Sequence, residues 1–105
     1  MPSVRITVLK RTFQDDILEQ EIRDEKFKRQ FGPCSIFEDG QAFVSEDWPT
    51  MPSGFCERAW PDIRHEVAMV MYKATAPWIT PAGFTITCCN DGVRPVIFRI
   101  ERLEH

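Results

Sequence analysis

Apolar and polar residues alternate at the start of the chain. Val4, Ile6 and Val8 would share one face of a strand, because successive side chains of a strand point to opposite sides. The alternation therefore predicts a strand over about residues 3–10. The next segment, residues 15–30, is rich in charges with scattered apolar positions, and it favours either one helix or a broken pair of helices.

Residues 57–74 carry a helical pattern. Their apolar positions recur every three or four residues, which gathers them on one face of a helix. Pro61 has to lie in the first turn, because proline lacks the N–H that later turns need, and this fixes the helix start near Cys56 or Glu57. The predicted buried stripe comprises Trp60, Ile63, Val67, Val70, Met71 and Ala74. We expect this stripe to pack on a sheet.

Two alternating segments near the end of the chain predict a closing β-hairpin. A loop of three residues ending at Gly92 puts apolar Ile86 opposite apolar Val96, whereas a shorter turn mixes apolar and charged faces. Such a loop needs a positive φ at its third residue, which glycine adopts without strain. In this register Cys88 points into the core and Cys89 points to the opposite face.

The order of these elements predicts an α+β domain. One long helix and a shorter N-terminal helix would pack on a mostly antiparallel sheet that closes with the hairpin, and residues 34–44 would add two short strands around a turn at Asp39 and Gly40. The alternative is a small, partly open β-barrel with the long helix as its plug. We expect a single domain over residues 1–102, and residues 103–105 (Leu-Glu-His) look like the remnant of a purification tag.

The composition narrows the kinds of partner. The 105 residues carry a formal net charge of −3, which argues against binding to nucleic acid or to an anionic membrane. No apolar run approaches the roughly 20 residues of a membrane span, and the chain starts without a signal-peptide pattern. We therefore expect a cytoplasmic protein with reduced thiols, whose partner is another protein or a small molecule.

The four cysteines are the residues best suited to chemistry. Cys56 precedes the predicted long helix, where unpaired N–H groups and the helix dipole would stabilise a thiolate and make it the most reactive of the four. Cys88 and Cys89 point to opposite faces of a strand, so only one of them can join a site with Cys56. With Cys34 added, such a three-thiol site would suit zinc or another soft metal. Alternatively the thiols only pack, as free cysteines commonly do.

Other candidates are aromatic or charged residues in loops. Trp48 and Trp78 lie in proline-bearing loops and could line a ligand pocket or an interface, as could Arg94 of the hairpin. The two tryptophans could equally cap the ends of a small core. His65 lacks partners for a triad or a metal site, and we interpret it as a surface residue. No catalytic motif is present, so the sequence leaves open whether the protein is an enzyme.

Several sequence motifs of the chain resemble those of a family of short bacterial proteins of unknown function. They are residues 4–11, the Gly-Pro-Cys at 32–34, the Gly-x-x-Phe at 40–43, the Phe-Cys-x-x-Ala-Trp-x-Asp-Ile at 55–63 and the Cys-Cys-x-Asp-Gly-x-Arg-Pro-Val-x-Phe at 88–98. The resemblance spans most of the chain and implies a single-domain bacterial protein without an established activity. It carries over no catalytic residues.

Together these patterns favour a small ligand- or protein-binding module without catalysis of its own. The alternative is a thiol-dependent redox or metal-handling protein that uses Cys56 with Cys34 and with Cys88 or Cys89. A third possibility is an accessory subunit that self-associates through its tryptophan-bearing loops. No cofactor is predicted, although zinc or another soft metal would suit the thiol alternative.

Overall fold

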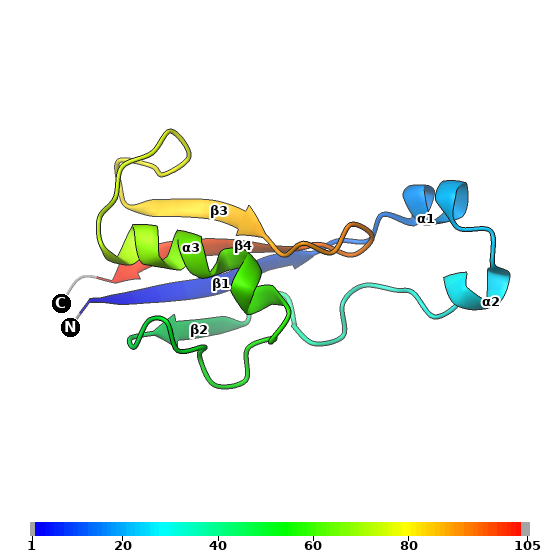
Figure 1. Ribbon diagram of the computed structural model, residues 1–105, viewed down its shortest axis with the longest axis horizontal. Helices are drawn as coiled ribbons and strands as arrows, with labels where there is room; N and C mark the ends of the chain where they lie inside the picture. Colours follow the sequence, from blue (N-terminus) through cyan, green and yellow to red (C-terminus); the bar gives the residue numbers. More distant parts are fainter. Residues whose placement is uncertain (1, 104–105) are drawn as a thin grey trace.

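The computed structural model of the chain describes residues 2–103, which form four strands and three helices (Figure 1). In chain order these elements are β1 (Ser3–Arg11), α1 (Asp15–Glu21), α2 (Glu25–Lys28), β2 (Ala42–Ser45), α3 (Ala59–Met71), β3 (Phe84–Cys88) and β4 (Val96–Leu103). Within residues 2–103 no helix has the length and apolar character needed to cross a bilayer.

The four strands form one antiparallel sheet in the order β2-β1-β4-β3, and α3 lies across one of its faces (Figure 1). The long strands β1 and β4 are central, whereas β2 and β3 are the edges. The predicted α+β class is therefore confirmed. The barrel alternative is wrong, because the edge strands do not pair with each other and the sheet stays open.

The core lies between α3 and the sheet, as the alternation and the helical period predicted. Val4, Ile6 and Val8 of β1 are inaccessible to solvent, and so is Val67 of α3. The predicted stripe of α3 is buried except for Ala74, which lies beyond the end of the helix and is exposed. Four phenylalanine rings in edge or tilted contact, with centroids 4.9–5.9 Å apart, complete the core: Phe37, Phe43, Phe55 and Phe98.

The C-terminal end of α3 is closed by a left-handed residue. Lys73 has φ +60°, and its N–H donates to the carbonyl of Val70 at 3.3 Å. The N–H of Ala74 donates to the carbonyl of Met69 at 2.9 Å. This pair of bonds is the Schellman arrangement, in which glycine is the usual left-handed residue. A lysine in that place carries a backbone strain that glycine would not.

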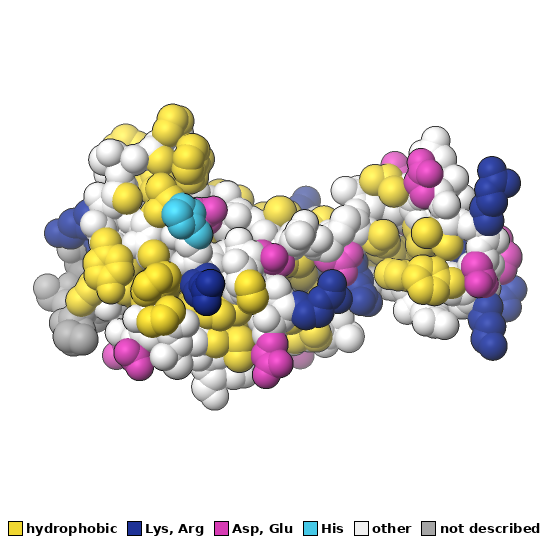
Figure 2. Space-filling view, in the orientation of Figure 1, with side chains coloured by type: hydrophobic (Ala, Val, Ile, Leu, Met, Phe, Trp, Pro, Cys, Tyr) yellow, Lys and Arg dark blue, Asp and Glu magenta, His cyan; other side chains and the backbone are white. Residues whose placement is uncertain are grey.

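The charged segment after β1 forms the broken pair of helices. We call residues 14–31, which contain α1 and α2, the helical arm; it projects from one end of the sheet (Figures 1 and 2). The radius of gyration is 15.3 Å, against about 13 Å for a compact domain of this length, and the projecting arm accounts for the excess. Leu18 is buried, and the rings of Phe27 and Phe31 meet edge to face at 5.0 Å.

The predicted register of the closing hairpin is wrong. Ile86 lies opposite Arg99 and Cys88 opposite Ile97, so Cys88 is exposed and Cys89 turns inward against the core. The loop between the strands is longer than three residues, and Gly92 does not have a positive φ.

The inward face of β3 is therefore the polar one. Thr85 is buried, and its hydroxyl donates to the carbonyl of Trp78 at 2.7 Å, so burial leaves the hydroxyl paired. On the outward face the guanidinium of Arg99 covers the ring of Phe84 at 4.1 Å, while Ile86 is 50% exposed. The alternation of apolar residues predicted that Ile86 would face the core. The prediction failed because this edge strand has its apolar side on the face of the sheet that α3 does not cover.

The other local predictions are partly confirmed. Gly40 makes the predicted turn with φ +84°, and its N–H donates to the carbonyl of Val8 at 2.7 Å. Of the two strands predicted over residues 34–44, only β2 forms. Leu103, which the sequence assigned to a tag, pairs with Ser3 as the last residue of β4, and residues 104–105 lie outside the described part.

Candidate functional site: a cavity lined by three cysteines

Three segments far apart in the sequence enclose one cavity of about 260 Å³ beside the N-terminal end of α3. The first is residues 34–37, which follow the helical arm, and the second is residues 56–62, which contain the start of α3. The third is residues 89–96, which comprise the β3–β4 loop (residues 89–95) and the first residue of β4. Each of these segments contributes one cysteine. We call this space the thiol cavity.

Cys34, Cys56 and Cys89 line the thiol cavity, and each packs partly buried against the hydrophobic core. Cys88 does not line it and is exposed on the other side of β3. The structure thus brings together the three thiols that the sequence considered as one site, and it selects Cys89 of the adjacent pair. All four cysteines are free thiols.

Cys56 occupies the entrance to α3. Its carbonyl accepts the N–H of Trp60 at 3.0 Å, which is the first helical hydrogen bond, while its neighbour Phe55 anchors the segment in the core. Among residues 2–103 no side chain makes a capping hydrogen bond at this end of the helix. Pro61 falls in the first turn, as predicted, and the regular helix begins at Ala59. Cys56 therefore lies within a few residues of the helix start.

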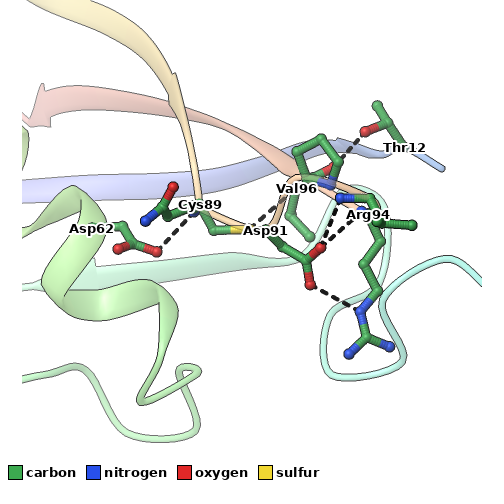
Figure 3. Close-up of polar contacts among 9 residues, drawn as sticks. Thr12, Asp62, Cys89, Asp91, Arg94 and Val96 are labelled. Atoms are coloured by element: carbon green, nitrogen blue, oxygen red, sulfur yellow. Dashed lines mark hydrogen bonds and ion pairs between the residues drawn. The ribbon is translucent and has the colours of Figure 1, made fainter. Parts of the chain in front are cut away.

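Cys89 is fixed by the strand that returns beside it. Its Sγ accepts the N–H of Val96 at 3.4 Å, and its own N–H donates to the carbonyl of Val96 at 3.2 Å (Figure 3). The thiol is consequently held at the wall of the cavity.

The structure does not support the three-thiol metal centre. In the part of the chain the structure describes, no group of three or more His, Cys, Asp or Glu side chains is placed to hold a metal ion.

Asp91 organises the β3–β4 loop. Its Oδ1 accepts the N–H groups of Val93 and Arg94, each at 3.0 Å, and its Oδ2 lies 3.0 Å from Nε of Arg94 (Figure 3). Burial opposes ionisation of this carboxyl, but the two N–H groups and the guanidinium outweigh burial and hold its pKa below the usual value. Arg94 also lies over the ring of Phe31, 5.3 Å from its centroid, and thereby connects the loop to the helical arm.

Asp62 joins α3 to the same loop. Its Oδ2 accepts the N–H of Asn90 at 2.8 Å (Figure 3). The apolar stripe predicted for residues 57–74 does not include Asp62, and Asp62 is not among the site residues that the sequence predicts. The spacing in the sequence could have indicated it. Arg58 and Ala59 precede Asp62 by four and three residues, so the three residues share one side of a helix, and that side lines the cavity.

The remaining candidates lie elsewhere. Trp48 belongs to the loop after edge strand β2, where its indole N–H donates to the carbonyl of Arg64 at 2.9 Å. Trp78 is 57% exposed in the loop before the opposite edge strand, β3. His65 is exposed on α3. Of the predicted pocket residues Trp48, Trp78 and Arg94, only Arg94 lines the thiol cavity.

The fold and the cavity define a small α+β protein with an open four-stranded sheet, one covering helix and a thiol-lined cavity at its end. No family model, curated protein or solved structure matches the chain. The sequence motifs suggest a resemblance to short bacterial proteins, and this resemblance therefore stays a prediction.

Proposed function

We propose that this protein is a small-ligand-binding module without catalysis of its own, and that the thiol cavity is its binding site. The single observation that carries the proposal is the convergence of three distant segments on one cavity with polar and apolar walls. Ligand sites commonly combine an apolar lining with a few fixed polar groups. The cavity volume of about 260 Å³ lies just below the usual range for ligand pockets of roughly 300–1,000 Å³, which favours a small molecule.

The walls are held by hydrogen bonds within the protein. Asp91 fixes the β3–β4 loop, Asp62 ties that loop to α3, and Nη1 of Arg11 donates to the carbonyl of Cys34 at 3.1 Å. A site whose shape is set before binding loses less conformational entropy when the ligand arrives. We further propose a cytoplasmic location, since four free thiols suit a reducing compartment.

A fragment screen by NMR tests the proposal. Uncharged, anionic, cationic and zwitterionic fragments are titrated into ¹⁵N-labelled protein, and a hit should shift the amides of residues 34–37, 56–62 and 89–96 saturably. The same hit should slow alkylation of Cys56 and Cys89 while Cys88, which lies outside the cavity, reacts unchanged. Hits that map only to other surfaces would contradict the proposal.

Thiol-dependent redox chemistry is the second candidate, favoured by the three free thiols at one cavity. Hydrogen peroxide would oxidise two cavity thiols to a disulfide and be reduced to two molecules of water. The sulfur–hydrogen bonds break, a sulfur–sulfur bond forms, and both protons end in water. Peptide mapping should then find links only among Cys34, Cys56 and Cys89, and oxidation confined to Cys88 would exclude this candidate.

Thiol reactivity provides a separate measurement for the second candidate. Accessibility alone favours Cys88, whereas the uncapped start of α3 favours Cys56. A redox role predicts that iodoacetamide at neutral pH modifies Cys56 fastest. If Cys88 reacts fastest and the three cavity thiols react slowly and alike, packing is their role.

A further inference from the structure

We propose that the ligand of the thiol cavity is a small zwitterion of the α-amino acid type, with its carboxylate at Arg58 and its ammonium at Asp62. The inference rests on the proposed function, because it names the class of ligand for the same cavity. It follows from which charges at the cavity are already paired within the protein and which are not.

Residues 2–103 place four charged side chains at the cavity, and two of them pair with each other. Asp91 and Arg94 form an ion pair at 3.0 Å, and both are half-buried in the loop. Their charges cancel locally, and the Asp91 carboxylate already accepts two backbone N–H groups. This pair therefore shapes the wall and adds no uncompensated charge to it, although within residues 2–103 the terminal amino groups of Arg94 keep donors that a ligand carboxylate can also use.

The other two charges, Arg58 and Asp62, have no ionic partner among residues 2–103. Arg58 is exposed, lines the cavity, and makes neither an ion pair nor a side-chain hydrogen bond within this part of the chain. Asp62 uses one oxygen for the N–H of Asn90, and within residues 2–103 no donor reaches the other oxygen. The guanidinium of Arg58 and the carboxylate of Asp62 thus border the same cavity, and they offer unused hydrogen-bond donors and an unused acceptor, respectively.

The arrangement of these two charges favours a ligand that bridges them. Arg58 is the N-cap residue of α3 and Asp62 lies in its first turn, four residues later, and this order of Arg then Asp is the less favourable orientation for a direct helical ion pair. A monoanion would satisfy Arg58 and be repelled by Asp62, whereas a monocation would meet the reverse problem. A zwitterion satisfies both, and its apolar part can rest on Phe37, Ala59 and Val96, which also line the cavity.

Three probes that carry the same isobutyl group test the inference. They are L-leucine, isopentylamine, which lacks the carboxylate, and 4-methylpentanoate, which lacks the ammonium. Each is titrated into the ¹⁵N-labelled 105-residue protein while the amides of Asp62, Asn90 and Cys89 are followed. We expect L-leucine to bind saturably and at least about tenfold more tightly than either singly charged probe.

Substitutions at the two charges complete the test. Arg58→Gln and Asp62→Asn should each weaken binding of L-leucine about tenfold; Asp62→Asn keeps an oxygen for the N–H of Asn90, so the loop remains attached. Arg64→Gln removes an exposed arginine on α3 outside the cavity and should leave binding unchanged.

Two results would overturn the inference. Equal affinity for 4-methylpentanoate and L-leucine, with Asp62→Asn silent, would make the cavity an anion site. Absence of saturable shifts with all three probes would reject the zwitterion class. The broader fragment screen separates this failure from failure of the proposed function, because uncharged or anionic fragments that still bind in the cavity would preserve the binding module and reject only its zwitterionic ligand.

Discussion

The carboxylate of Asp91 and the guanidinium of Arg94 meet at 3.0 Å within a single loop, three residues apart in sequence. The same carboxylate accepts the backbone N–H of Arg94, so the residue is held at both its main chain and its side chain. Since Arg94 also covers the ring of Phe31, this pair joins the cavity wall to the helical arm. The loop therefore depends on one carboxylate rather than on glycine.

Replacing Asp91 with alanine should destabilise the protein by about 2 kcal/mol, because it removes two backbone hydrogen bonds and a partly buried ion pair. The free energy of unfolding is measured by urea denaturation. Asp39→Ala is the matched control, since Asp39 pairs with Arg11 at 3.2 Å but is largely exposed, and its loss should be smaller. Equal losses for the two variants would contradict the role assigned to Asp91.

The contribution of Asp91 should disappear in acid. The hydrogen bonds and the guanidinium hold the pKa of its carboxyl in the folded state below the value in the unfolded chain. The folded state therefore binds its proton less readily, and the stabilisation is complete above the unfolded pKa of about 3.9 and is lost as the pH falls through the folded pKa. The stability difference between the wild type and Asp91→Asn should accordingly be constant from pH 7 to about pH 5 and shrink below about pH 4. A difference that grows on acidification would show that the sign is wrong.

The hairpin shows where sequence reasoning reaches its limit. The alternation in residues 84–88 and 96–101 correctly indicates two paired strands. It cannot choose their register, because that choice depends on a side chain in the loop, Asp91, and on a buried threonine whose hydroxyl finds the carbonyl of Trp78. From polarity alone, Thr85 would be expected to face solvent and Ile86 to face the core. The hydrogen bond at Thr85 and the open face of the sheet reverse that order.

Lys73→Gly should stabilise the protein by about 1 kcal/mol. Lys73 has φ +60° in the Schellman turn after α3, and glycine adopts this conformation without the clash of a side chain. Thermal and urea unfolding measure the gain. Lys73→Ala is the control, because it removes the charge and keeps the Cβ, and it should give no comparable gain. A stabilised alanine variant would assign the effect to the lysine side chain instead of the backbone.

Val67→Asp should unfold the protein. Val67 is fully buried between α3 and the sheet, and an unpaired charge there costs several kcal/mol, which is comparable to the whole stability of a small domain. Circular dichroism and one-dimensional NMR report the loss of structure. His65→Asp, two residues earlier on the exposed side of α3, should remain folded. A folded Val67→Asp protein with native spectra would show that the helix phase is wrong.

The helix and the central strand could be predicted because their periods are unbroken. Val4, Ile6 and Val8 alternate without exception, and the stripe from Trp60 to Met71 follows the helical period to the last turn. The helix end was missed because a lysine, not a glycine, takes the left-handed position. The cavity could not be predicted from the sequence, because Cys34 and Cys89 are far apart in the chain and line the same cavity only because the arm returns beside the β3–β4 loop.

The two ends of the helical arm are secured separately to the body of the protein. Before the arm, the N–H of Thr12 donates to the carbonyl of Pro95 at 3.0 Å; after it, Nη1 of Arg11 donates to the carbonyl of Cys34. The chain thus leaves the sheet and comes back to the place it left, so residues 14–31 form an excursion whose length the sheet does not fix. Since the closure entropy of such an excursion grows only slowly with its length, insertions and deletions there would cost the sheet little. The arm is the part of this chain in which evolution could add or remove whole turns while the strands and their register stay as they are.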